Sequence, residues 1–573
     1  MTRFRVWAPN ATAVELDLSG RRVPMAAAGR GWFEADIPDA GPGADYGFSL
    51  DGGPVRPDPR SPWQPAGVDG PSRTVDHAAF PWADAGWRGV HLPSAVIYEL
   101  HVGTFTPEGT FDAVIRRLDH LVDLGVDVME LLPVAEFPGT RGWGYDGVDL
   151  YAPHSAYGGP DGLKRLVDAC HARGLGVVMD VVYNHLGPAG NHLGAYGPYF
   201  TERYATPWGQ AVNLDQAGSD EVRAFFVDNA LMWLRDYHCD GLRLDAVHAI
   251  LDTSAMHLLE ELAVEVEALA ASVGRPLFLV AESDLNDPRV VRRREVGGYG
   301  MDAQWSDDFH HAVHAALTGE RDGYYADFGS LTDIATALRR AFVHAGGYSP
   351  YRDRRHGRHD ATLSGHRFLG YAQNHDQVGN RARGERSAAL MSPGRLQLAA
   401  ALVLTSPFVP MLFQGEEWAA GTPFQYFTDH ADPALGRAVS DGRRSEFVAF
   451  GWQPADVPDP QDPATFERSK LDWSELGEKD HAAVLDWHRR LIALRRSVPE
   501  LTDGRLDLVV CRVDEDAGSL VVRRGPVTVA GNIGARAVEL AAEGSVVLAS
   551  DGAELVTGGT LRLAPDSVAV LTA

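Results

Sequence analysis

The chain has 573 residues, of which 45% are hydrophobic, and a formal net charge of −26. That length permits a large core and more than one domain, whereas the excess of negative charge argues against nucleic acid and anionic membranes as partners. The three cysteines are scattered without metal-ligand spacing, and there is no signal-peptide pattern or long apolar run, so we expect a cytoplasmic protein without a disulfide framework, a zinc site or a membrane span.

The first zone of the chain, to about residue 90, has the period-2 pattern of half-buried strands. Phe4 and Val6 form one alternating run, and Val14, Leu16 and Leu18 form the next. Clusters of glycine and proline separate such runs and then dominate an extended stretch that begins near residue 51. This pattern predicts a small antiparallel β-sandwich followed by a linker, which together form an N-terminal accessory domain over residues 1–92.

The second zone alternates short apolar segments with amphipathic helical segments. One helix is expected from the apolar face between Phe111 and Val122, with Thr110 as its N-cap and Gly125 as its stop, and another is expected near 162–174. Strand-like apolar segments recur before and after these helices. Because each is followed by room for a helix, the pattern predicts a parallel (β/α)8 TIM barrel, an α/β fold, over residues 93–498. The eight segments are 95–100, 126–132, 175–182, 241–247, 277–282, 301–305, 367–373 and 408–413.

The third zone, from about residue 500, returns to short β patterns. Strand-like runs occur at 505–513, 519–524, 526–531, 545–550 and 567–572. We therefore expect a small all-β C-terminal domain over residues 499–573.

Polar residues follow the predicted barrel strands at the ends where a (β/α)8 barrel places its reacting groups. A single acidic residue at a strand end is usually a turn former or a helix N-cap. Here five successive strands end in such groups, which turn chemistry alone does not explain, so these ends are the candidate active site. The residues are Asp180, Asn184 and His185 after the third strand, Arg243 and Asp245 on the fourth, Glu282 after the fifth, Asp307, Asp308, His310 and His311 after the sixth, and His375, Asp376 and Gln377 after the seventh.

Three of these residues have the properties that glycosidic cleavage requires. Arg243 and Asp245 are two positions apart, so in a strand both side chains point to one face. A neighbouring cation favours the ionised form of a carboxylate, and an ionised carboxylate can act as a nucleophile. Glu282 ends an apolar strand, where partial desolvation would raise its pKa toward a value useful for a general acid. Two carboxyls in unlike environments can cleave a glycosidic bond.

Four segments, 180–185 (DVVYNH), 241–248 (GLRLDAVH), 280–284 (VAESD) and 373–377 (QNHDQ), resemble the four signature regions of the α-amylase family of glycoside hydrolases. They occur in the order of the family, each on the expected strand. The resemblance extends over the whole chain and implies a retaining hydrolase of α-glucosidic bonds.

The resemblance also implies roles for individual residues. It assigns the nucleophile to Asp245, the general acid/base to Glu282 and a third, non-reacting carboxylate to Asp376, with Asp180 supporting Arg243. The residues expected to bind the sugar are Tyr145, which would stack on it, together with His185, Arg243, His375, Gln377 and Asn380.

The sequence departs from many amylases just after the nucleophile. The Lys-His pair whose second carbonyl helps to bind calcium is replaced here by His248 and Ala249. Asn184 matches another common calcium-ligand position, but an Asn after a strand is also ordinary loop chemistry. We therefore expect no metal and no cofactor, and we expect His248 to face the leaving group.

Three further stretches, 184–200, 304–314 and 429–447, resemble the branch of the family that cleaves the α-1,4 bond between trehalose and a maltooligosaccharide. Maltooligosyl trehalose or a related α-glucan is then the expected substrate, and a maltooligosyltrehalose synthase the expected functional partner. The polar residues of the second stretch, Asp307, Asp308, His310 and His311, are expected to bind sugar hydroxyls. A solvated helix start with Ser306 or Asp307 as N-cap is the alternative.

Two other functions stay open. A 1,4-α-glucan branching enzyme shares the three carboxylates but transfers the glycosyl group to a sugar hydroxyl. A catalytically inactive glucan-binding module is disfavoured by the complete set of carboxylates, Arg243 and both histidines.

Overall fold

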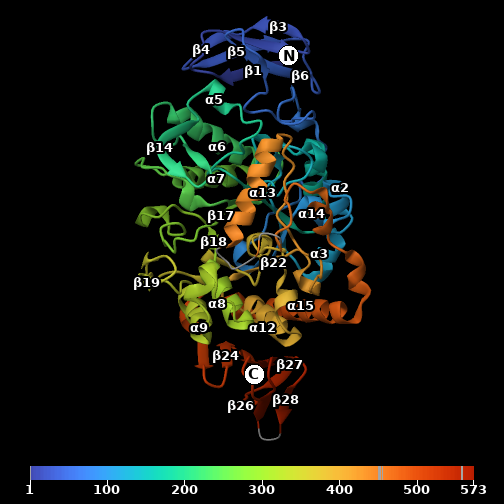
Figure 1. The fold of residues 1–573 in the computed structure, drawn as a ribbon, viewed down its shortest axis with the longest axis vertical. Coiled ribbons are helices and arrows are strands. Elements are labelled where there is room, and N and C mark those ends of the chain that lie inside the picture. The colour runs from blue at the N-terminus through green and yellow to red at the C-terminus, as the bar shows by residue number, and fades with distance from the viewer. Residues whose placement is uncertain (1, 449–452, 454–455, 557–558) are drawn as a thin grey trace.

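The computed structural model describes residues 2–448, 453, 456–556 and 559–573. The molecule is elongated, with a β-sandwich at one end, a barrel in the middle and a second β domain at the other end (Figure 1). This is the predicted fold class, and the order of the three parts follows the chain. The boundaries proposed at 92/93 and 498/499 stay predictions.

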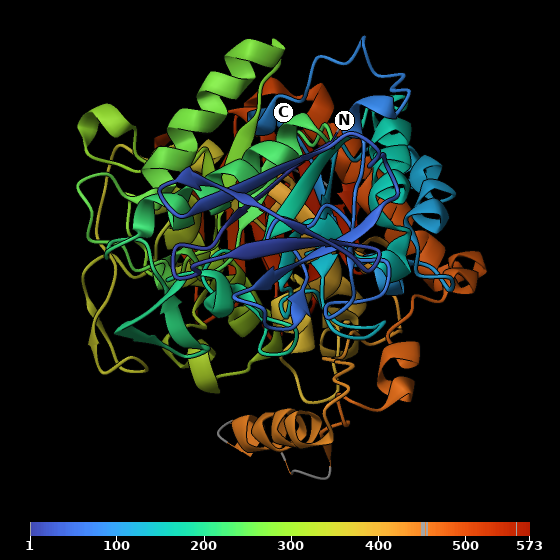
Figure 2. The same cartoon turned by 90° about the horizontal axis from the view of Figure 1, so that it is seen from above.

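The first domain consists of two antiparallel sheets. Phe4, Val6, Val14 and Leu16 are buried, as the period-2 pattern predicted. Viewed along the long axis, these strands lie across one end of the barrel (Figure 2). One sheet has the order β1 (Thr2–Trp7), β5 (Trp32–Ile37), β4 (Ala26–Gly29), and the other the order β3 (Arg21–Pro24), β2 (Val14–Leu18), β6 (Asp45–Leu50), β7 (Val55–Arg56), with β8 (Ser72–Arg73) paired to β6.

The middle domain is a closed barrel of eight parallel strands, and each predicted strand is present. Successive strands are neighbours, and the last pairs with the first. Because every strand pair is parallel, all the carboxyl ends meet at one mouth. The strands are β9 (Ile97–Leu100), β10 (Val128–Leu131), β13 (Gly176–Val181), β16 (Gly241–Leu244), β17 (Phe278–Ala281), β18 (Ala303–Trp305), β21 (Phe368–Gly370) and β22 (Val409–Phe413).

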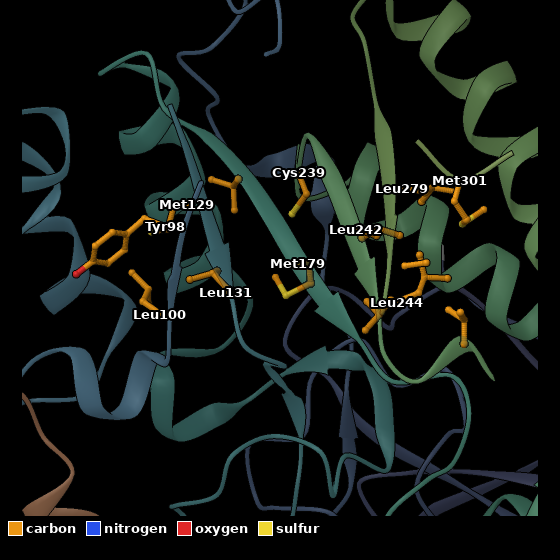
Figure 3. Close-up of a cluster of buried hydrophobic side chains, with 14 of the residues drawn as sticks. Tyr98, Leu100, Met129, Leu131, Met179, Cys239, Leu242, Leu244, Leu279 and Met301 are labelled. Carbon is orange, nitrogen blue, oxygen red and sulfur yellow. The ribbon is translucent and has the colours of Figure 1, made fainter. Parts of the chain in front are cut away.

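Alternate strand residues pack on opposite sides of the barrel wall. Val128, Val178 and Val280 belong to a cluster inside the barrel, whereas their neighbours along the strands pack outward against the helices. Figure 3 shows this outer layer, in which Met129, Met179, Leu242 and Leu279 come from four adjacent strands. The two apolar layers fix the register, so the polar residues past the strand ends face the mouth.

The helix predicted between Phe111 and Val122 is divided into two. Thr110 caps the first with its side chain, and Gly125 ends the second in the left-handed conformation, at φ 97°, as expected. Between them the amides of Arg116 and Arg117 bond to carbonyls three residues back, so the helix tightens and restarts. The main helices of the barrel are α2 (Phe111–Ile115), α3 (Leu118–Leu124), α4 (Gly159–His171), α6 (Ser219–Arg235), α7 (Leu258–Val273), α8 (Asp307–Thr318), α9 (Leu331–Arg340), α12 (Pro393–Leu404) and α15 (Lys479–Ser497).

Short hairpins and further helices are attached to the barrel. The hairpins are β11 (Ala135–Glu136) with β12 (Asp149–Pro153), β14 (Phe200–Thr206) with β15 (Gly209–Val212), and β19 (Tyr348–Ser349) with β20 (Arg354–Arg355). The remaining α-helices are α1 (Val102–Phe105), α5 (Leu193–Tyr196), α10 (His375–Gly379), α11 (Ser387–Leu390), α13 (Pro433–Val448) and α14 (Pro463–Arg468). Helix α13 stands out from the body of the molecule (Figure 2).

The C-terminal domain contains the five predicted strands and three more. The predicted runs are β23 (Val510–Asp514), β24 (Ser519–Arg524), β25 (Val527–Asn532), β27 (Ser545–Ala549) and β30 (Ser567–Thr572), which form one sheet. A second sheet is built from β26 (Val538–Ala541), β28 (Ala553–Val556) and β29 (Thr560–Leu563). No helix within the described part of the chain is long and apolar enough to cross a membrane.

Candidate active site

The polar residues predicted at the strand ends converge on one guanidinium. Asp180 on β13 is in register with Arg243 on the adjacent strand β16, and Asp245 follows that strand by one residue. The Nη1 atom of Arg243 donates to Asp180 at 2.8 and 2.9 Å and to Asp245 Oδ1 at 2.9 Å. Its Nη2 atom lies 3.7 Å from Glu282 Oε2. Arg243 is fully buried, and the ring of Trp305 lies 4.1 Å from its Cζ atom.

The turn after Asp245 links the two reactive carboxyls. Asn184 donates its amide to Asp245 Oδ2 at 2.7 Å and to the Asp245 carbonyl at 2.9 Å. The next residue, Ala246, has a φ of 39°, a left-handed conformation that is strained for a residue with a Cβ atom. In that conformation its amide donates to Glu282 Oε2 at 2.5 Å. The strained turn therefore fixes Glu282 relative to Asp245.

The environment of Glu282 favours its neutral form. Burial raises its pKa well above the ordinary value of 4.5, and the charges of Asp245 and Asp376 act in the same direction, against the opposing effect of Arg243. A carboxyl with a raised pKa keeps its proton near neutral pH and can donate it to a leaving oxygen. The environments of Glu282 and Asp245 are thus unlike, as the sequence predicted.

A second cation lies on the other side of the site. His375 Nδ1 contacts Glu99 Oε1 at 2.5 Å, and its Nε2 atom contacts the hydroxyl of Tyr145 at 2.8 Å. Burial alone would lower the pKa of His375, but Asp376 and Glu99 raise it to about 9. The Tyr145 hydroxyl also donates to Asp180 Oδ2 at 2.7 Å. Tyr145 therefore joins the arginine cluster to the imidazolium, and its ring stacks on His375 with centroids 5.2 Å apart.

Asp376 has the most solvent-exposed side chain of the three carboxylates, at 38%, against 12% for Asp245 and 15% for Glu282. Its Oδ1 atom lies 3.4 Å from His375 Nε2 and accepts a hydrogen bond from Asn380 Nδ2 at 3.4 Å. An exposed carboxylate at the mouth can accept bonds from sugar hydroxyls. Gln377 lies on the same short helix, α10, and its Oε1 atom is buried without a partner among the described residues.

The predicted hydroxyl-binding segment on α8 behaves differently. Asp308, His310 and His311 are buried, and only Asp307 is partly exposed. Asp308 Oδ2 accepts from Asn286 Nδ2 at 2.9 Å and from the amides of Val343 and His344 at 2.6 and 2.9 Å. These three hydrogen bonds hold Asp308 against the loop at 343–344, and a sugar contact by its side chain stays a prediction. Ser306 is the helix N-cap by position, without a side-chain hydrogen bond.

The two histidines of the same segment also face inward. The Nδ1 atoms of His310 and His311 lie 2.9 Å apart, and His310 stacks on Tyr371. Burial lowers the pKa of His310 well below 6.5 and that of His311 to about 3, so both rings are neutral. The side chain of Asp307 accepts a hydrogen bond from Tyr371 at 2.5 Å, and burial raises its pKa to about 7. Asp307 is the member of this segment that can reach a ligand.

Two exposed or unpaired groups flank the mouth. Trp208, on the β14–β15 hairpin, is 48% exposed and stacks on His185 with centroids 5.0 Å apart and an interplanar angle of 12°. His185 Nε2 contacts the carbonyl of Tyr145 at 3.0 Å. His248, in the turn of Val247–Ala249 beyond the nucleophile strand, has a buried Nδ1 atom without a partner among the described residues. The binding of a sugar by His185 and His248 stays a prediction.

Calcium binding is not tested by this structure. Asn184 donates its amide nitrogen to Asp245, and its carbonyl oxygen contacts His185 Nδ1. Within the described residues no group of three or more His, Cys, Asp or Glu side chains is arranged to hold a metal ion. The expectation of no metal stays a prediction.

Three residues of the site, Glu99, Trp305 and Trp208, were missed from the sequence. Glu99 and Trp305 sit in apolar strands, where a lone charge in β9 and a lone aromatic at the end of β18 were the only signals. The hydrogen bonds from Asn184 to Asp245 were not foreseen, because Asn184 was considered only as a match to a calcium-ligand position. Trp208 gave no signal, because its hairpin is short and polar.

The arrangement can carry out double-displacement chemistry at a sugar carbon. One carboxyl, Asp245, is oriented by a guanidinium and an amide. The second, Glu282, lies beside it with its pKa raised by burial. Retaining cleavage needs such a pair about 5–5.5 Å apart. Asp245 Oδ1 accepts from Nη1 of Arg243 at 2.9 Å, and Glu282 Oε2 lies 3.7 Å from Nη2 of the same guanidinium.

Comparisons with known proteins agree with this chemistry. Residues 74–193 match the family model described as "Alpha amylase, catalytic domain", and residues 1–63 match "Carbohydrate-binding module 48 (Isoamylase N-terminal domain)". The malto-oligosyltrehalose trehalohydrolase of Arthrobacter ramosus is 55% identical over 552 residues, 96% of this chain and 95% of the relative. The same enzyme of Rhizobium sp. (strain M-11) is 52% identical over 585 residues, 99% of this chain and 97% of the relative.

A solved structure supports the fold over the full length. The crystal structure of a Salmonella typhimurium protein described as an α-amylase superposes with a TM-score of 0.92 at 41% sequence identity. The match covers 100% of this chain and 97% of the other.

Proposed function

The chain belongs to the malto-oligosyltrehalose trehalohydrolases of the α-amylase family, and from this membership we propose that it hydrolyses the α-1,4-glucosidic bond next to the trehalose end of maltooligosyl trehalose. The products are trehalose and a maltooligosaccharide, and the anomeric configuration is retained. The observation that carries the proposal is the carboxyl pair at the barrel mouth, in which the protonated Glu282 and the arginine-paired Asp245 are linked through the amide of Ala246 and the guanidinium of Arg243.

In the first step Asp245 attacks the anomeric carbon and the bond to the leaving oxygen breaks. Glu282 gives its proton to that oxygen, which departs as a hydroxyl of trehalose. In the second step Glu282, now a carboxylate, removes a proton from water, and the water displaces Asp245 from the glycosyl carbon. Asp376 accepts hydrogen bonds from sugar hydroxyls and strengthens them in the transition state. His375, as a cation, and Tyr145 support that sugar.

Recognition of the trehalose end needs groups on the leaving-group side of the scissile bond. The unpaired Nδ1 atom of His248 and the partly exposed carboxyl of Asp307 are our candidates for these contacts. A buried polar group that loses its partner disfavours the wrong ligand by about 1–3 kcal/mol. Two such contacts would give about a hundredfold preference in kcat/KM over plain maltooligosaccharides.

The test compares maltotriosyl trehalose with maltopentaose as substrates for the full chain. From maltotriosyl trehalose we expect free trehalose and a maltooligosaccharide released as its α-anomer. Attack on maltopentaose should be slow. Replacing Asp245 with Asn should lower kcat by several orders of magnitude and leave binding largely intact. Equal rates on both substrates, or an Asn variant that keeps more than about a tenth of the activity, would overturn the proposal.

A branching activity would instead form α-1,6 branches in amylose, and the same assay run on amylose detects it. The full-length relatives above do not favour that alternative. A reaction that places trehalose at the end of a maltooligosaccharide must supply the substrate. The functional pairing with such a synthase and the cytoplasmic location remain predictions.

A further inference from the structure

A hollow of about 130 Å³ lies between the two sheets of the C-terminal domain. This domain is at the opposite end of the molecule from the first β-sandwich (Figure 1). The large sheet lines the hollow with β23 and β24, and the small sheet lines it with β26 and the turn that follows. The lining is mostly apolar and includes Val521, Leu540 and Leu571, while Arg512 and Arg523 are exposed beside them. None of the lining residues belongs to the active site.

The hollow exists because the small sheet covers only part of the large one. Strand β28 lies against β27 and β30, and β29 lies against β30. At the other side of the large sheet, α9 packs against one face of β23 and β24, where Cys511 and Val513 point inward. The opposite face of these two strands carries Val510, which is 48% exposed. An apolar strand face is therefore left open beside the small sheet.

Strand β26 borders this hollow with a free edge. It is the end strand of the order β26-β29-β28, and among the described residues it pairs only with β29. In such an edge strand, alternate amides and carbonyls point away from the partner strand and bond to no other strand. An edge of this kind, next to an open apolar face, can accept an additional strand from another chain.

Two arginines determine which charge that strand should carry. Arg512 is exposed and has no hydrogen-bond or ion-pair partner among the described residues. Arg523 Nη1 lies 3.8 Å from Glu543 Oε2, with 58% and 87% of these side chains exposed, so water screens the pair. Across the two strands Arg512 faces Val521, and Arg523 faces Val510. Because guanidinium groups bind carboxylates, this surface fits a strand whose apolar side chain is flanked by acidic ones.

The volume of the hollow limits the apolar part of the ligand. A cavity of about 150 Å³ lined by apolar side chains holds one benzene molecule, so this hollow accommodates one phenyl ring or branched aliphatic group. We propose that it is a docking site for an extended acidic segment of a partner protein. The segment adds a strand to β26, inserts one apolar side chain between the sheets and pairs its carboxylates with Arg512 and Arg523.

A second copy of this chain suits the surface less well. In a symmetric contact between two copies the same patch meets itself. Arg512 and Arg523 of both copies would then lie in one interface and repel one another.

The test measures binding of a fluorescein-labelled peptide, Glu-Thr-Phe-Thr-Glu, to the full chain by fluorescence anisotropy. In an extended peptide its two glutamates and its phenylalanine share one face. Lys-Thr-Phe-Thr-Lys reverses the charge, and a version of the first peptide that is N-methylated at every amide cannot donate to an edge strand. Both control peptides should bind about tenfold more weakly than the first, or not at all.

Variants of the chain locate the binding. Arg512→Glu should weaken binding of the first peptide about tenfold. Arg536→Glu reverses an exposed arginine of the same domain that does not line the hollow, and it serves as the matched control with little effect. Ala542→Trp, at a partly exposed position on the wall, should fill the hollow and act like Arg512→Glu without lowering the melting temperature.

The outcomes decide the proposal independently of the proposed function. The absence of binding at about 1 mM of the first peptide rules the proposal out, as does an affinity that Arg512→Glu and Ala542→Trp leave unchanged. A dimer of the chain that Ala542→Trp dissociates would replace the partner segment by a second copy and contradict the proposal. Release of trehalose from maltotriosyl trehalose should be equal in all these variants, and its absence from the unaltered chain would count against the proposed function alone.

Discussion

Removal of a single oxygen atom, by Tyr145→Phe, tests the link between the two cationic parts of the active site. The Tyr145 hydroxyl donates to Asp180 at 2.7 Å and contacts His375 Nε2 at 2.8 Å. Asp180 would still accept from Arg243 at 2.8 and 2.9 Å. His375 Nε2 would be left with only the more distant oxygen of Asp376, at 3.4 Å.

The expected loss follows from that difference. Because the pKa of His375 is about 9, its Nε2 atom carries a proton near neutral pH and donates a charge-assisted hydrogen bond to the hydroxyl. A hydrogen bond to a charged group contributes about 1.5–3 kcal/mol. If that support is greatest when the sugar is distorted toward the transition state, kcat/KM should fall about 10- to 100-fold.

The assay is steady-state hydrolysis of maltotriosyl trehalose, with the melting temperature measured in parallel. Tyr183→Phe is the matched control, because its hydroxyl donates to Asn229 at 2.7 Å in the packing between the barrel and α6, away from the carboxylates. Both variants should lose similar stability, but only Tyr145→Phe should lose activity. Equal kinetics in the two variants would refute the reasoning.

Three more predictions address stability and binding. The pKa of His375 in the folded chain, about 9, exceeds the ordinary 6.5, so the stabilising effect of its protonation is full below about pH 6.5 and is lost as the pH rises through about 9. The free energy of urea unfolding should therefore decline by about 3 kcal/mol over that window, and His375→Gln should remove the decline. An unchanged decline in the variant would contradict the raised pKa. Asp308→Ala leaves three donors unpaired and should lower the free energy of unfolding by about 3 kcal/mol. A smaller ratio of kcat/KM between trehalose-ended and plain chains, with unchanged stability, would instead support the sugar contact expected from the sequence. Trp208→Ala removes an exposed ring stacked on His185 and should raise KM about tenfold with little change in melting temperature; an unaltered KM would show that the ring does not meet substrate.

The barrel was predictable because its strands are continuous apolar runs in fixed alternation with helices. Period and length identify such segments without tertiary information. The helix after β9 was predicted as one and is two, because the apolar stripe crosses Arg116 and Arg117 without a break in composition. The strands β26, β28 and β29 were missed because they are only four residues each, although Leu561 and Leu563 of β29 alternate and are buried.

The core of the site was predictable for a similar reason. Arg243 lies on β16 and Asp245 follows its end by one residue, so the alternation of an extended chain already places the two side chains on one face. The hydrogen bonds of Asp308 were not predictable, because they depend on the approach of the loop at 343–344, far along the chain. A short stretch of sequence predicts which residues share a strand or helix. Contacts between loops depend on tertiary packing, which such a stretch does not reveal.

The contact between Glu99 and His375 spans 276 positions, from the first barrel strand to the helix after the seventh. Barrel closure, through the pairing of β22 with β9, brings these two residues together. A ribosome that has made only the first half of the chain has therefore made Asp245 and Glu282 but not the imidazolium that faces them. On the proposed function, we expect glucan cleavage to require that almost the whole barrel has been synthesised and that its ends have met, so a chain that stops before β22 should be inactive.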